Sequence, residues 1–157
     1  MAPLEGFGGE VLRPDDSGYE DARRIHNGLI DKRPAIIARC RGAADVAAAV
    51  DAGSDAVGFV LYARSPRHVD LERAARLARE LPPFVTAVLL FVNAPVAEVS
   101  AAAALLPQAT LQFHGDESPA ECDAAGRPYL RAVRMAPGVD LLDFAHRFPN
   151  AQALLLD

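Results

Sequence analysis

Residues 55–62 read Asp-Ala-Val-Gly-Phe-Val-Leu-Tyr, and residues 85–93 read Val-Thr-Ala-Val-Leu-Leu-Phe-Val-Asn. Each is a near-continuous apolar run, the pattern of a strand that is buried on both faces of a sheet. Between them lie a polar loop with Ser-Pro-Arg at 65–67 and a stretch whose apolar residues recur at helical spacing. A strand, a helix and a second strand in this order form a βαβ unit, so residues 55–93 predict a parallel sheet.

The same alternation of strands and helices continues toward the end of the sequence. Further apolar runs that predict strands lie at 35–38, 110–113, 129–133 and 153–156. They give about six strands, or seven with a weak one near Val11, and the helical stretches fall between them. We therefore predict an α/β fold, with a parallel sheet that is either open or closed into a barrel.

Composition and charge limit the classes of function. The 157 residues are enough for one domain with a core. The formal net charge of −5 argues against nucleic acid or an anionic membrane as the partner. The two cysteines, Cys40 and Cys122, do not form a disulfide framework, so we expect free thiols and a cytoplasmic location. Residues 1–10 lack the basic and apolar regions of a signal peptide.

Two polar side chains stand out because they follow predicted strands. In parallel α/β folds the ligand sites lie at the carboxyl ends of the strands. Arg67 lies in the loop after the first strand of the βαβ unit, and His114 comes directly after the strand at 110–113. Both are therefore expected to contact a ligand, whereas Arg64 is expected to be a surface charge. No second histidine or cysteine lies at ligand spacing from His114, so no metal site is predicted.

Most of the sequence from residue 51 onward resembles one enzyme family. The matching stretches are Ala-Gly-Ser-Asp-Ala-Val-Gly-Phe at 52–59, Ser-Pro-Arg-His-Val at 65–69, Leu-Pro-Pro-Phe-Val at 81–85, Phe-Val-Asn-Ala-Pro at 91–95, Leu-Gln-Phe-His-Gly-Asp-Glu-Ser at 111–118 and Leu-Leu-Leu-Asp at 154–157. They resemble phosphoribosylanthranilate isomerase, a (β/α)8-barrel (TIM-barrel) enzyme of tryptophan biosynthesis. The resemblance implies a partial barrel that ends before the family's last two strands.

The resemblance also implies a reaction and the residues that perform it. The family carries out an Amadori rearrangement of a phosphoribosyl substrate without a cofactor, through a general acid and a general base. Its acid is an aspartate at the end of the sixth strand, which corresponds to Asp157 here. The arginine of Ser-Pro-Arg, here Arg67, holds the substrate carboxylate, and His114 is expected to contact the substrate.

The general base of the family has a less clear counterpart in this sequence. The family uses a cysteine in a Lys-Ile-Cys-Gly strand end, and this motif is absent here. Cys40 ends a predicted strand at a similar place and is the candidate base, although an ungapped register puts Ala38 there. In the family the substrate phosphate binds to the loops after strands seven and eight. These strands are missing from this sequence, so we expect weak or no isomerase activity from this chain.

The first fifty residues resemble a different family. Residues 11–23 and 33–40 are similar to the start of a flavin-linked (FAD) oxidase. This predicts a chimera in one structural domain, with an oxidase-like segment at 1–50 joined near 45–53 to an isomerase-like part at 51–157. No glycine-rich loop follows the next strand, so a flavin site is not expected. The alternatives are an FAD-binding oxidase fragment and a non-enzymatic chimeric fold, whose open sheet edges would form a homo-oligomer.

Overall fold

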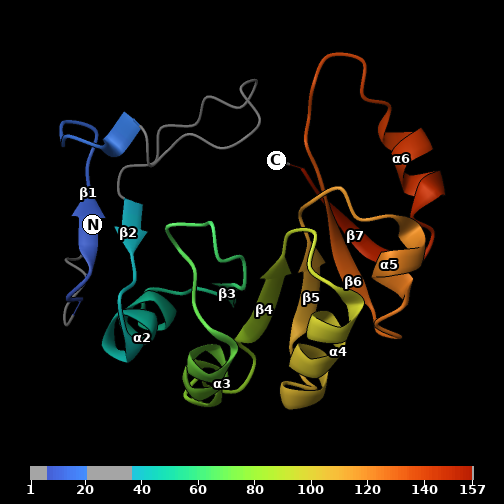
Figure 1. The fold of residues 1–157 in the computed structure, drawn as a ribbon. Helices are drawn as coiled ribbons and strands as arrows, with labels where there is room; N and C mark the ends of the chain where they lie inside the picture. Colours follow the sequence, from blue (N-terminus) through green and yellow to red (C-terminus); the bar gives the residue numbers. More distant parts are fainter. Residues whose placement is uncertain (1–6, 21–36, 157) are drawn as a thin grey trace.

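The computed structural model describes residues 7–20 and 37–156 of the chain. Its central element is a parallel sheet whose five strands are hydrogen-bonded in sequence order (Figure 1). The strands are β3 (Ala56–Val60), β4 (Thr86–Phe91), β5 (Thr110–Phe113), β6 (Tyr129–Val133) and β7 (Ala151–Leu156). Since all five run in the same direction, their carboxyl ends lie along one edge, which we call the carboxyl edge. The predicted α/β fold with a parallel sheet is confirmed.

Helices connect the strands of the sheet, and two of them begin at clear polar caps. They are α3 (Leu71–Arg79), α4 (Val96–Leu105), α5 (Pro119–Asp123) and α6 (Leu141–Arg147), and α2 (Ala43–Asp51) precedes β3. The Asp70 side chain accepts a hydrogen bond from the Arg73 nitrogen at the start of α3. Ser118 and Glu121 form a reciprocal capping box at the start of α5. Polar caps therefore fix where each of these two connections turns back from the carboxyl edge.

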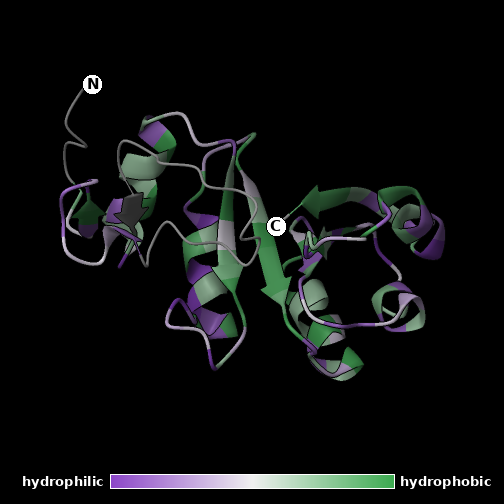
Figure 2. Cartoon of the chain, turned by 90° about the horizontal axis from the view of Figure 1, so that it is seen from above, coloured by the Kyte–Doolittle hydropathy of each residue, from purple (hydrophilic) through white to green (hydrophobic). Residues whose placement is uncertain are grey.

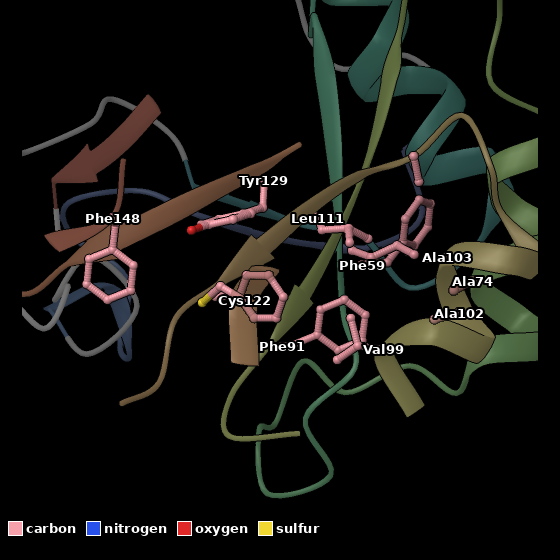
Figure 3. Packing of buried hydrophobic residues seen from close by; sticks show 13 residues of the cluster. Phe59, Ala74, Phe91, Val99, Ala102, Ala103, Leu111, Cys122, Tyr129 and Phe148 are labelled. Atoms are coloured by element: carbon pink, nitrogen blue, oxygen red, sulfur yellow. The ribbon is translucent and has the colours of Figure 1, made fainter. Parts of the chain in front are cut away.

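The hydrophobic core lies between the sheet and these helices (Figure 3). Alternate residues of the strands, such as Phe59 and Leu111, contribute their side chains to it. The Phe113 ring lies between those of Phe91 and Tyr129, at centroid distances of 6.0 and 5.4 Å. Small side chains on the helices, Ala74, Ala102 and Ala103, allow close packing against these rings. Figure 2 shows the strands as mainly hydrophobic, whereas the helices carry both kinds of residue.

The strand expected at residues 35–38 does not join the parallel sheet, and this part of the prediction is wrong. Residues 35 and 36 lie outside the described residues, and the observed strand is β2 (Ile37–Arg39). It pairs antiparallel with β1 (Glu10–Leu12), and Figure 1 draws it running opposite to β4 and β5. The parallel sheet thus has five strands within the described residues, not six or seven. A three-residue strand carries too little periodicity to indicate which partner it takes or in which direction.

No helix in the described part of the chain is long and apolar enough to cross a membrane.

Candidate active site

Arg67 and His114 follow two strands of the parallel sheet and reach the same edge. Arg67 lies in the loop between β3 and α3, is exposed, and donates its backbone N–H to Ser65 Oγ at 3.1 Å. His114 comes directly after β5. Only β4 separates β3 from β5, so the two strands are about 10 Å apart. The expectation that both residues lie at the carboxyl edge is consistent with the strand order.

The His114 ring is held by a residue of its own strand. Gln112, which is buried, lies two residues earlier and therefore on the same face of the sheet. Its Nε2 lies 3.1 Å from His114 Nδ1. The tautomer of the His114 ring sets which of the two groups donates in this hydrogen bond. The backbone is fixed as well, because the His114 N–H donates to the Phe91 carbonyl at 2.9 Å.

A buried ion pair lies beneath the loop that carries His114. Arg131 on β6 and Glu117 before α5 are each about 95% buried, with Arg131 Nη1 3.6 Å from Glu117 Oε2. Arg131 donates to the carbonyls of Phe113 and Gly115, both at 2.9 Å. Glu117 accepts the backbone N–H groups of Asn93 at 2.7 Å and Gly115 at 2.8 Å. The two side chains therefore tie together the loops that follow β4 and β5.

Cys40 lies apart from this arrangement. It directly follows β2, which belongs to the antiparallel pair and not to the parallel sheet. Its Sγ donates to the Asp45 carbonyl at 3.5 Å. Burial of part of the thiol and, second, the negative charge of Asp45 raise the pKa of Cys40 above its ordinary value. A raised pKa reduces the thiolate fraction at neutral pH, and so weakens this cysteine as a base.

Asp157, the candidate acid, lies outside the described residues, so the structure gives its side chain no position. It follows β7 directly in the sequence. Within the described residues, no group of three or more His, Cys, Asp or Glu side chains could hold a metal ion.

The carboxyl edge and its loops belong to a part of the chain that is similar to known proteins. A sequence model of the family described as N-(5'phosphoribosyl)anthranilate (PRA) isomerase matches residues 36–157. The chain belongs to this family. The N-(5'-phosphoribosyl)anthranilate isomerase of Methylibium petroleiphilum is 68% identical over 114 residues, which are 73% of this chain and 54% of that protein.

Solved structures of the family share the fold. Phosphoribosyl anthranilate isomerase in complex with reduced 1-(o-carboxyphenylamino)-1-deoxyribulose 5-phosphate (rCdRP) matches with a TM-score of 0.61 and 32% identity, over 72% of this chain and 58% of that one. Monomers generated from the dimeric Thermotoga maritima enzyme match with a TM-score of 0.62 and 31% identity, over 72% of this chain and 59% of that one. The chain thus spans between half and three-fifths of the length of these PRA isomerase relatives.

The sequence did not identify Glu117 and Gln112 as parts of the candidate site, and it did not decide whether Arg131 or Arg134 faces it. A usable signal was present for Arg131, because a charged residue inside the apolar strand Tyr-Leu-Arg-Ala-Val must find a partner when it is buried. Its partner could not be identified, since Glu117 is 14 residues away and only the packing of β5 against β6 brings them together. In the sequence, Glu117 is one of several acidic residues in a loop and carries no distinguishing pattern.

Proposed function

We propose that this chain supplies the carboxyl-edge residues of a PRA isomerase, which performs the Amadori rearrangement of N-(5'-phosphoribosyl)anthranilate in tryptophan biosynthesis. The observation that carries the proposal is the 68% identity over 114 residues to a protein named as this isomerase. The family match at residues 36–157 includes the sheet, Arg67 and His114. Because the chain spans only part of the length of its relatives, we propose its activity and substrate by similarity to them.

The proposed roles follow the chemistry of the rearrangement. Asp157 donates a proton to the ring oxygen of the ribose as the bond between C1 and that oxygen breaks, which leaves a Schiff base. Cys40 is the candidate base that removes the proton from C2, and the enolamine then becomes the aminoketone. Arg67 pairs with the anthranilate carboxylate through its planar guanidinium. His114 contacts the substrate through its imidazole ring, which the contact with Gln112 helps to orient.

We further propose that residues 1–157 alone have weak or no isomerase activity. Cys40 is a poor candidate for the general base, because it follows a strand outside the parallel sheet and its pKa is raised. Conversion of the phosphoribosyl substrate by the purified chain, followed by chromatography, tests this directly, and ready turnover would contradict it.

Binding can be tested without turnover. We expect rCdRP, added to the 15N-labelled chain, to shift the NMR signals of the loops after β3 and β5. Arg67→Gln should weaken binding by about tenfold, because it removes one charged hydrogen-bonding partner. Arg64→Gln is the matched control, since Arg64 is an exposed arginine of the same loop. Equal effects of the two substitutions, or shifts elsewhere on the chain, would overturn the proposed site.

The range of the family match bears on the two alternatives from the sequence, the FAD-binding oxidase fragment and the non-enzymatic chimera. It begins at residue 36, so the alanine-rich helix α2 belongs to the family part, and a join near 45–53 is not needed to explain it. The oxidase resemblance of residues 1–50 and the chimera remain predictions. A yellow purified protein with flavin absorption bands would support them, and a colourless protein would end the flavin interpretation.

The proposed function also concerns how copies of the chain associate. A relative from Thermotoga maritima is described as dimeric. Within the described residues, the strands at the two edges of the parallel sheet, β3 and β7, each pair with one other strand of the sheet. Unpaired edges are sites where a second copy can bind, so we propose a homo-oligomer. Sedimentation that shows only monomer at high protein concentration would contradict this.

A further inference from the structure

We infer that Arg131 and Glu117 are positioning residues that set the orientation of His114 at the carboxyl edge. The inference rests on the proposed function for the role of His114 itself. Neither residue is assigned a contact with substrate, and both act through the loop between β5 and α5. Arg131 donates to backbone carbonyls on either side of His114, and Glu117 accepts the Gly115 N–H of this loop and the Asn93 N–H of the loop after β4.

The guanidinium of Arg131 holds the backbone on both sides of His114. Nη1 donates to the Phe113 carbonyl and Nη2 to the Gly115 carbonyl, each at 2.9 Å. These are the carbonyls of the residues immediately before and after His114. A planar, rigid guanidinium that binds both fixes their relative orientation, and with it the direction in which the His114 side chain leaves the backbone.

Glu117, which carries the opposite charge, adds further hydrogen bonds to the backbone of the same loop. Its two oxygens accept the N–H groups of Asn93 and Gly115, so one carboxylate joins the loop after β4 to the loop after β5. The Asn93 side chain adds a third link, because its Oδ1 accepts the Asp116 N–H at 2.7 Å. The backbone on either side of His114 is thus bound by partners from neighbouring segments, and little freedom is left for the ring to change its place.

The position of Arg131 is itself fixed by α6 and the residue that follows it. Its guanidinium carbon lies 4.9 Å from the centroid of the Phe148 ring and 5.7 Å from that of Phe144. Among the described residues, the buried Nε of Arg131 has no hydrogen-bond partner. A guanidinium that leaves its own Nε unsatisfied while both terminal nitrogens bind loop carbonyls is oriented to suit the loop.

The chain contains a matched control. Arg127 also binds carbonyl oxygens, those of Ala103, Leu106, Pro107 and Ala109. These lie at the end of α4 and in the connection to β5, where the strand begins. Replacing Arg127 therefore removes a similar set of hydrogen bonds at the opposite edge of the sheet from His114.

The experiment compares Arg131→Met with Arg127→Met in the whole chain labelled with 15N-histidine. We expect both substitutions to lower thermal stability, but only Arg131→Met to shift the ring 15N signals of His114 and to weaken rCdRP binding by about tenfold, the equivalent of one charged hydrogen bond. Arg131→Lys, which keeps the charge but not the fork, should restore part of the stability and not the ring signals. His114→Asn assigns these signals.

A second variant keeps the inference testable if Arg131→Met does not fold. Glu117→Gln keeps the shape of the side chain but has only one oxygen to accept two N–H groups, so it should shift the same ring signals. Unchanged His114 signals in Arg131→Met and Glu117→Gln, or equal shifts in Arg127→Met, would overturn the inference. Failure of rCdRP to bind the unsubstituted chain would instead overturn the proposed function, and the ring signals would still decide the positioning role.

Discussion

A Cβ atom on Gly115 would lie 2.7 Å from the backbone nitrogen of Asn93, so the loops after β4 and β5 approach more closely than any other residue type allows. This contact brings the Asn93 side chain to the Asp116 N–H and the Glu117 carboxylate to the Asn93 N–H. The closeness of the two loops is therefore a condition for the hydrogen bonds that hold His114.

Gly115→Ala is expected to destabilise the fold by about 1 to 3 kcal/mol, because the new methyl group meets backbone that cannot move without breaking these hydrogen bonds. Urea denaturation followed by circular dichroism measures this free energy of unfolding. Gly58→Ala is the matched control, since Gly58 lies in β3 and a Cβ atom added there would have nothing within 4 Å. It should be neutral or stabilising by up to about 1 kcal/mol. Equal losses in the two variants would show that the close approach is not what matters at Gly115.

The pH dependence of stability is expected to depend on Asp45. Its carboxylate is buried and accepts the N–H groups of Gly8, Gly9, Arg41 and Gly42. These hydrogen bonds, the one from Arg41 foremost, hold the pKa of Asp45 below its ordinary value of 3.8, although burial acts in the opposite direction. Because the pKa is lower in the folded state, this stabilisation is present above the ordinary pKa and is lost as the pH falls through the lowered folded value.

Thermal melting of the Asp45→Asn variant between about pH 7 and about pH 3 measures this contribution. We expect a lower melting temperature at neutral pH and a flatter decline toward acid, since one carboxylate fewer must be protonated. Asp70 and Glu121, whose pKa values are also lowered by hydrogen bonds from the backbone, supply the dependence that remains. Asp51→Asn, at the exposed end of the same helix, should leave the curve close to that of the unsubstituted chain.

The fold was predictable where burial imposes a pattern on the sequence. β3, β4 and β5 are apolar and place Phe59, Leu89 and Leu111 in the core, and the capping box at Ser118 marks a helix start that the structure reproduces. The partner of β2 was not predictable, since three residues carry neither length nor period. For the candidate site, the sequence indicated only which residues follow the ends of strands. Arg67 and His114 were predicted in this way and stay predictions, whereas the Arg131–Glu117 pair depends on the packing of β5 against β6.

The two thiols are expected to differ strongly in reactivity. Cys122 is fully buried, and burial raises its pKa to about 12. Cys40 is exposed, so a disulfide reagent can reach it even though its pKa is raised. At about pH 8, Ellman's reagent should therefore titrate one thiol in the folded chain and a second only after denaturant is added. Cys40→Ser should abolish the first reaction. Rapid reaction of both thiols without denaturant would show that α5 does not pack as described.

Phe84 combines full exposure with a backbone conformation that suits few side chains. Its φ angle is 73°, in the left-handed region, and its exposed fraction is 101%. A residue with a Cβ is destabilised there by about 1 kcal/mol, and asparagine tolerates the region best after glycine. Phe84→Asn should thus raise the free energy of unfolding by about 0.5 to 1 kcal/mol, measured in urea.

Phe84→Ala is the control for this last substitution, because it removes the same exposed ring without supplying a side chain that favours positive φ. Phe84→Asn should be the more stable of the two. A loss of stability in both variants that grows with protein concentration would contradict the expectation. It would mean that the ring is covered by a second copy of the chain, and sedimentation of the unsubstituted chain and both variants would then separate this contact from the backbone effect.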